Sequence, residues 1–124
     1  METTDTPQKD YKTVVQLTSD EPRVFKSMIR QIGNLLDYLD GRVSVEIICH
    51  GASAAFCRKD DNPFQAELQA LQARGVLIMA CIKMLDSASL NQDQLLEKTI
   101  IIPSGIGRLV LRQHEGWSYI RAGI

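Results

Sequence analysis

GVLIMACIKMLDSASL, residues 75–90, contains the change of pattern that decides how this chain folds. Five apolar residues run from Val76 to Ala80, which is typical of a strand that is covered on both faces. Cys81 follows directly, and residues 82–90 can continue as a helix. The stretch therefore predicts a thiol at the junction of a strand and a helix, where it is either core filling or the working atom of the protein.

The same succession of apolar strands and amphipathic helices extends in both directions along the chain. Between Phe25 and Leu39, apolar residues recur at spacings of three and four, which predicts a helix with one apolar face. Pro22 suits the first turn of this helix, and Ser19 or Asp20 can cap it. The predicted strands are residues 12–18, 42–50, 76–80, 99–103 and 117–121. The predicted helices are residues 22–39, 52–58 and 63–74, a short piece after Cys81, residues 92–98 capped by Asn91, and residues 104–116.

Strands that alternate with helices predict an α/β protein with a mostly parallel sheet. A chain of 124 residues has the length of one domain. Its first ten residues are polar, so we expect residues 1–10 to be a flexible N-terminal tail and residues 11–124 to form a single domain.

Composition narrows the classes of function. Hydrophobic residues make up 44% of the chain and charged residues 23%, as in an ordinary globular domain. A net charge of −1 without a basic run argues against nucleic-acid binding. The apolar runs are far shorter than the roughly 20 residues of a membrane span. The N-terminus lacks the features of a secretory signal, and three cysteines are an odd count, so we expect a cytoplasmic protein with free thiols.

Polar or reactive residues follow each of the first four predicted strands. Ligands of parallel sheets bind outside the carboxyl ends of the strands, so these residues are expected to share one rim of the sheet. They are Ser19 and Asp20, His50 and Gly51, Cys81, and finally Ser104 and Gly105.

Cys81 is the first candidate for chemistry at this rim. A thiol is nucleophilic only as the thiolate, and the start of a helix stabilises an anion by about 0.3–1 kcal/mol. Lys83 adds to this effect if its side chain turns inward, whereas burial against Ile78 or Met79 opposes it. The alternative is that Cys81 is a small buried hydrophobic residue, which is a common fate of free cysteine.

The other candidate groups are weaker. His50 can carry a proton or orient a group beside Cys81, or it can simply be a hydrogen-bonded histidine at a strand end. Cys49 points to the opposite face and is expected in the core. Cys57 is expected to be partly exposed, where it can act as a second, resolving thiol. Metal-binding spacings such as C-x-x-C are absent, so no metal is expected.

Several motifs in order resemble the DsrE/DsrF-like family, a group of small α/β proteins associated with sulfur relay. The motifs are VVQLTSDEP, IGNLL, VEIICHG, LQARGVLIMAC, IIIPSGIGRLVLRQ and EGWSYI, and together they extend from about Lys12 to Ile120. The resemblance implies a three-layer α/β/α sandwich around a five-stranded, mostly parallel sheet. It also implies a homo-oligomer or hetero-oligomer, often a trimer or hexamer.

In sulfur-relay members of this family, a cysteine accepts sulfur as a persulfide from a donor protein and passes it to an acceptor protein. Cys81 stands after GVLIMA, where many members carry AC, so the resemblance assigns this role to Cys81 without any cofactor. Two departures reshape the rim: IKML replaces the usual small residues after the cysteine, and GAS replaces Gly-Pro-Gly after the second strand. Whether the protein is an enzyme of sulfurtransferase type stays open. The alternative function is a non-catalytic binding or assembly module in which Cys81 only packs.

The C-terminal stretch RLVLRQHEGWSYIRAGI predicts a contact between subunits. Leu109 and Leu111 lie about 200° apart on a helix, so one face cannot bury both against the sheet. Trp117 and Tyr119 alternate on a predicted edge strand, and an edge strand invites a partner. We therefore expect a homo-oligomer, with a trimer ahead of a dimer.

Overall fold

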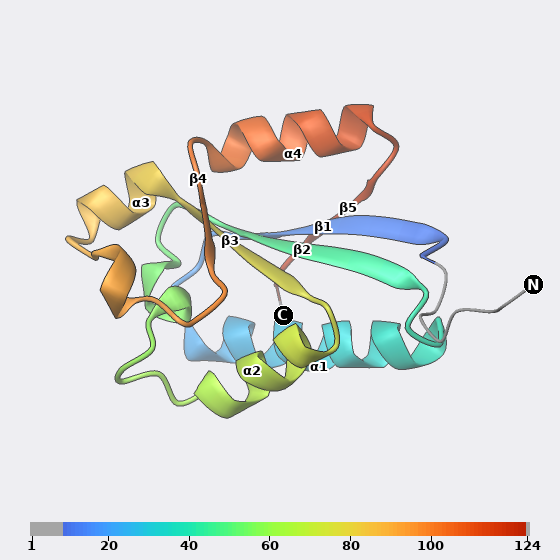
Figure 1. The fold of residues 1–124 in the computed structure, drawn as a ribbon, viewed down its shortest axis with the longest axis horizontal. Coiled ribbons are helices and arrows are strands. Elements are labelled where there is room, and N and C mark those ends of the chain that lie inside the picture. Colours follow the sequence, from blue (N-terminus) through green and yellow to red (C-terminus); the bar gives the residue numbers. More distant parts are fainter. Residues whose placement is uncertain (1–8, 124) are drawn as a thin grey trace, which may run out of the picture.

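The computed structural model describes residues 9–123, and these form a five-stranded sheet between layers of helices (Figure 1). Most of the tail predicted at residues 1–10 lies outside the described residues. Lys9 and Asp10 are inside them, and the Lys9 ammonium donates to the Gly41 carbonyl at 2.7 Å. The strands are β1 (Tyr11–Leu17), β2 (Val43–Cys49), β3 (Leu77–Cys81), β4 (Ile100–Ile102) and β5 (Ser118–Arg121). The α-helices are α1 (Pro22–Tyr38), α2 (Gln65–Ala73), α3 (Ile82–Ser87) and α4 (Gly105–His114), and two 3₁₀ turns span Ala54–Cys57 and Gln92–Gln94.

The order of the strands explains the layers. The sheet runs β4-β3-β2-β1-β5, and every neighbouring pair is parallel. The chain steps across the sheet in one direction from β1 to β4, and then returns to the far edge at β5. Because crossovers between parallel strands are right-handed, this return places α4 on the face opposite α1 and α2, as Figure 1 shows. The predicted three-layer sandwich is therefore confirmed, and its sheet is fully parallel.

Alternation along the strands divides the core between two faces. The face toward α1 and α2 carries the larger cluster, in which Val15, Leu17 and Ile47 are almost completely buried. The face toward α4 carries a small cluster, made of Val14, Ile48, Met79, Ile102 and Leu109, with Trp117 packed against it. The α4 layer therefore has few apolar contacts and depends on other interactions.

Glu46 supplies those interactions from the middle of β2. Its side chain is 2% exposed and binds two arginines of α4. Arg108 donates through Nε and a terminal nitrogen to the two carboxylate oxygens, both at 3.0 Å. Arg112 donates to the same oxygens at 3.3 and 2.7 Å, and its guanidinium lies 4.4 Å from the ring centre of Trp117. This buried ion cluster fixes α4 on the sheet.

The electrostatic balance at Glu46 favours the charged carboxylate. Burial by itself raises the pKa of Glu46, but the hydrogen bonds and charges of Arg108 and Arg112 outweigh it, so the pKa lies below its usual value. The same ion pairs raise the pKa of Arg112. The cluster is therefore ionised at neutral pH.

Three local expectations were wrong. Glu21, not Ser19 or Asp20, holds the N-cap position of α1. The stretch after Asn91 forms only the 3₁₀ turn Gln92–Gln94, because Leu95 and Leu96 turn into the core and are buried. Cys57 is fully buried because the 3₁₀ turn Ala54–Cys57 packs into the core.

Leu109 and Leu111 behave as the helical geometry predicts. Leu109 is 5% exposed and packs on the sheet, whereas Leu111 is 62% exposed on the outer side of α4.

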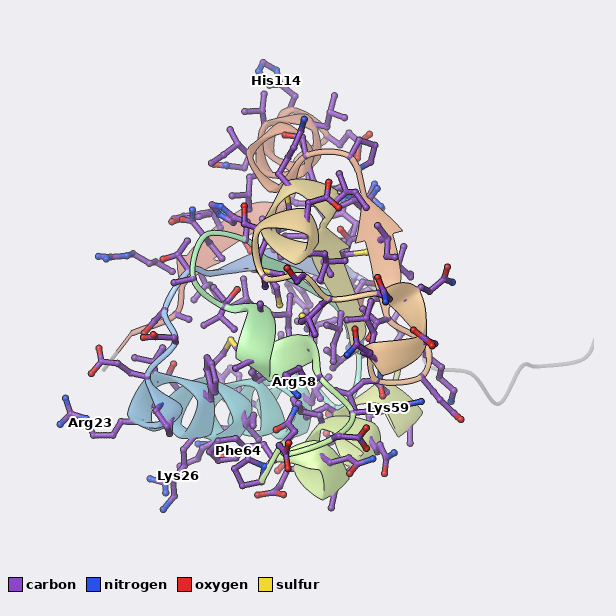
Figure 2. All side chains as sticks on the ribbon, turned by 90° about the vertical axis from the view of Figure 1, so that its left-hand side faces the viewer. Arg23, Lys26, Arg58, Lys59, Phe64 and His114 are labelled. Atoms are coloured by element: carbon purple, nitrogen blue, oxygen red, sulfur yellow. The ribbon has the colours of Figure 1, made fainter. Side chains whose placement is uncertain are left out.

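His114 projects from the end of α4 away from the body of the protein (Figure 2). Within residues 9–123, no helix combines the length and apolar character needed to cross a membrane.

Candidate functional site

The carboxyl ends of β2 and β3 bring His50 and Cys81 together. Cys49 pairs with Ala80 in the parallel register, so the next residue on each strand, His50 and Cys81, continues the same pairing. The His50 amide donates to the Leu17 carbonyl of β1 at 3.1 Å, so the ladder between β1 and β2 extends to His50. Neighbouring strands lie about 4.8 Å apart, and both side chains point to the face covered by α4.

A cavity of about 410 Å³ opens at this point. It lies between the ends of the strands and the first turns of α3 and α4. Its lining includes six of the eight candidate site residues from the sequence: His50, Gly51, Cys81, Lys83, Ser104 and Gly105. The remaining lining residues are Met84, Ser87, Pro103 and Ile106.

Cys81 presents its sulfur to the first turns of two helices. The backbone N–H groups of Lys83 and Met84 in α3 and of Gly105 in α4 lie near the thiol and favour its charged form. Burial, with only 7% of the residue exposed, raises the pKa of the Cys81 thiol. The three N–H donors and the charge of Lys83 outweigh burial, so the pKa lies below its ordinary value. The site therefore stabilises a thiolate.

Gly105 makes this arrangement possible because it has no side chain. A Cβ atom at Gly105 would lie 2.9 Å from Cβ and 3.0 Å from Cγ of His50, which is closer than such atoms approach. The N–H of Gly105 can therefore reach the Cys81 sulfur while its Cα rests against the His50 side chain. Ser104 caps the same helix, since its Oγ accepts from the Gly107 N–H at 2.9 Å.

His50 is held by two residues that the sequence analysis missed. The Nε2 atoms of Gln16 and His50 are 2.9 Å apart, and the Tyr119 hydroxyl donates to Oε1 of Gln16. Burial lowers the pKa of His50, so the ring is neutral at physiological pH. One signal pointed to Gln16: it is the single polar residue within the apolar run VVQL.

The remaining predicted residues lie outside the cavity lining. Ser19 accepts a hydrogen bond at its Oγ from the Glu21 N–H at 3.0 Å, and Asp20 is exposed. They shape the turn between β1 and α1. Gly51, in contrast, lines the cavity. Its backbone has a φ of 65°, in the left-handed region that favours glycine.

Cys49 and Cys57 form a second, enclosed pair of thiols. Both are 0% exposed, and burial together with the neighbouring Cys57 raises the pKa of Cys49 well above its ordinary value. Cys81 is thus the cysteine with access to a cavity. Among the residues that the structure describes, no three histidine, cysteine or acidic side chains gather in a way that could hold a metal ion.

Comparisons with known proteins agree with this architecture. A family model described as the DsrE/DsrF-like family matches residues 12–122. The solved structure of a protein of unknown function, MTH1491 from Methanobacterium thermoautotrophicum, is 30% identical and superposes with a TM-score of 0.85, covering 90% of this chain and 99% of that one.

Two more distant structures share the fold. The ychN protein from E. coli has a TM-score of 0.70 at 11% identity, with 90% of this chain and 97% of that chain covered. The conserved protein of unknown function BT1422 from Bacteroides thetaiotaomicron has a TM-score of 0.70 at 20% identity, with coverages of 89% and 93%. No curated protein matches the chain.

Proposed function

The chain belongs to the DsrE/DsrF-like family, and on that premise we propose that it is a sulfur-relay protein that carries sulfur as a persulfide on Cys81. One observation supports this most: Cys81 lines an open cavity at the starts of α3 and α4, where nearby backbone N–H groups and Lys83 favour an anionic sulfur. Such donors stabilise the thiolate before transfer and can equally bind a negatively charged persulfide after it.

The proposed transfer consumes no cofactor. The Cys81 thiolate attacks the outer sulfur of a donor persulfide, R–S–SH. A new S–S bond forms on Cys81 while the S–S bond of the donor breaks, and the donor leaves as the thiolate R–S⁻, which gives Cys81–S–SH. A thiolate of the acceptor protein then attacks the outer sulfur of Cys81–S–SH, which regenerates the Cys81 thiolate. Both steps exchange one S–S bond for another, so no external oxidant or reductant is needed.

Intact mass spectrometry tests the proposal. After incubation with glutathione persulfide, the wild-type chain should gain one sulfur atom that dithiothreitol removes. Cys81→Ser should abolish the gain completely, because it removes the attacking atom. Cys49→Ala is the matched control and should load normally, since Cys49 is fully buried. If the wild type does not load sulfur, or if Cys81→Ser still does, the proposed function is wrong.

A second candidate function is a binding or assembly module in which Cys81 only packs. The low exposure of Cys81, 7%, is the observation that favours it. Alkylation of the folded protein with iodoacetamide across pH separates the two functions. A relay protein should be alkylated with a midpoint below that of an unperturbed cysteine, in the direction of the lowered pKa. A packing residue should stay unmodified at every pH at which the protein is folded.

We also propose that the protein is a cytoplasmic homo-oligomer, with a trimer ahead of a dimer. The resemblance to oligomeric family members motivates this, and the outer side of α4 offers a surface, since Ile106, Val110 and Leu111 are each at least half exposed. Light scattering after size exclusion should give a multiple of the 13.9 kDa chain mass. Leu111→Lys should reduce that mass, and Tyr38→Lys, at a residue 85% exposed on α1, should not. A monomer at micromolar concentration would exclude the assembly.

A further inference from the structure

Four side chains, on or directly after four neighbouring strands, form a row that ends in the cavity. In the register, Gln16 of β1 lies opposite Ile48 of β2, so His50 is its diagonal neighbour on the same face. On β5, Tyr119 lies opposite Val14 and therefore also faces α4 together with Gln16. The row runs from Tyr119 through Gln16 and His50 to Cys81, and hydrogen bonds join its first three members.

The direction of the hydrogen bonds along this row determines the protonation of His50. The Tyr119 hydroxyl donates to Oε1 of Gln16, which directs the Gln16 Nε2 amide toward the imidazole. An amide nitrogen only donates, so Nε2 of His50 must accept. A neutral imidazole that accepts at one nitrogen carries its proton on the other, so His50 has its proton at Nδ1.

We infer that Gln16, oriented by Tyr119, is a positioning residue that holds His50 as the Nδ1–H tautomer. In this form His50 serves the sulfur site as a hydrogen-bond donor and not as the base that deprotonates Cys81. The second half of this inference rests on the proposed function of Cys81. The Nε2 lone pair of His50 is already occupied by Gln16, so it is closed to the thiol proton. The thiolate depends instead on the backbone N–H groups and Lys83.

The packing around His50 supports a fixed ring. Gly105 lies against Cβ, Cγ and Cδ2 of His50, with no room for even a methyl group between them. Gln16 occupies the Nε2 position. The titratable and charged groups nearby are Cys81 on β3, Lys83 on α3, and Tyr119 and Arg121 on β5; α4 contributes the uncharged Gly105. No carboxylate is among these groups, which is consistent with a neutral ring.

Nitrogen-15 NMR of the imidazole rings tests the tautomer directly. The chain has two histidines, and His114, exposed at the end of α4, serves as the internal reference for an unconstrained ring. At neutral pH, His50 should show a protonated Nδ1 and an unprotonated Nε2. A protonated Nε2 would overturn the inference, because the Gln16 amide would then have to accept through its oxygen.

Two substitutions test the hydrogen bonds that run from Tyr119 through Gln16 to His50. Gln16→Glu replaces the donor by a carboxylate that can only accept, so His50 should switch to the Nε2–H form and its pKa should rise by about one pH unit or more. Gln69→Glu, on an exposed position of α2 across the sheet, adds the same charge and should change neither property. Tyr119→Phe removes only the hydroxyl, so His50 should populate both tautomers. An unchanged spectrum in Gln16→Glu or in Tyr119→Phe would contradict the role assigned to that residue.

The pH dependence of Cys81 alkylation tests how the hydrogen bonds between Gln16 and His50 affect the Cys81 thiol. The wild-type rate should follow one titration, that of the thiol, whereas Gln16→Glu should add a second step at the raised pKa of His50. A histidine step in the wild type would show that His50 acts as a base and would overturn the inference. These readouts do not require sulfur loading, so a wild type with the expected tautomer that fails to accept sulfur refutes the proposed function alone.

Discussion

Glu46→Gln is expected to lower the free energy of unfolding by about 3 kcal/mol at neutral pH, because it leaves two arginines of α4 without the charge that they surround. The substitution keeps the shape of the side chain, removes its charge and replaces one acceptor oxygen by an NH2 group that can only donate. Arg108 and Arg112 each make two hydrogen bonds to the carboxylate, which is 2% exposed. The α4 face has only a small apolar cluster, so little else compensates for the loss.

The effect should depend on pH in a definite direction. The pKa of Glu46 is lower in the folded protein than its usual value of 4.5, so the folded state binds the proton more weakly than the unfolded chain. The stabilisation is therefore fully present above the unfolded pKa and is lost as the pH falls through the folded pKa. The difference between wild type and Glu46→Gln should accordingly shrink below pH 4.5.

Urea unfolding at neutral and acidic pH measures both effects. Glu115→Gln is the matched control, since Glu115 also binds Arg112, at 2.7 Å, but its side chain is 54% exposed. Such exposed pairs contribute about 0–1 kcal/mol. Equal unfolding free energies for the two variants would show that the buried cluster does not anchor α4.

Gly105→Ala is expected to raise the pKa of Cys81 and to lower its alkylation rate at neutral pH by about tenfold, if the displaced helix start costs one pKa unit. The added Cβ would lie 2.9 Å from Cβ and 3.0 Å from Cγ of His50, and the His50 Cβ is fixed to the backbone and cannot rotate away. The start of α4 must therefore move off the sheet. That movement withdraws the Gly105 N–H from the Cys81 sulfur. The strain should also cost about 1–3 kcal/mol of stability.

Gly33→Ala provides the control for the glycine substitution. Gly33 lies within α1, and a Cβ there would meet nothing within 4 Å. Alanine should therefore stabilise the protein by up to about 1 kcal/mol and leave Cys81 alkylation unchanged. A Gly105→Ala protein with wild-type alkylation kinetics would show that the Gly105 N–H does not support the thiolate.

Both substitutions act on α4, and together they link stability to the site. Glu46 binds the middle and the end of α4 through Arg108 and Arg112. At the start of the same helix, the N–H of Gly105 lies near the Cys81 sulfur. A helix loosened at the ion cluster should hold that N–H less firmly. The core of the fold and the electrostatics of the thiol therefore depend on the same element.

The sequence by itself determined the features that arise from local pattern. Five apolar residues before Cys81 were enough to predict a strand that ends at the thiol, and alternation with helices was enough to predict the α/β sandwich. Ligands of parallel sheets bind outside the carboxyl ends of the strands, and this rule was enough to predict that His50, Cys81 and Gly105 lie at one rim. These predictions succeeded because periodicity and strand direction are encoded in neighbouring residues.

Only the tertiary structure decided which distant groups touch. Gln16 reaches His50, and Glu46 meets Arg108, across 34 and 62 positions of the sequence. The depth of Cys57 likewise followed from packing of a short turn into the core. Such contacts depend on strand register and on the side of the sheet to which α4 crosses, and no local pattern fixes either. A polar residue within an apolar strand signals that a partner exists, but the identity of that partner is set by the fold, because burial leaves the polar group no alternative to the donor or acceptor placed beside it.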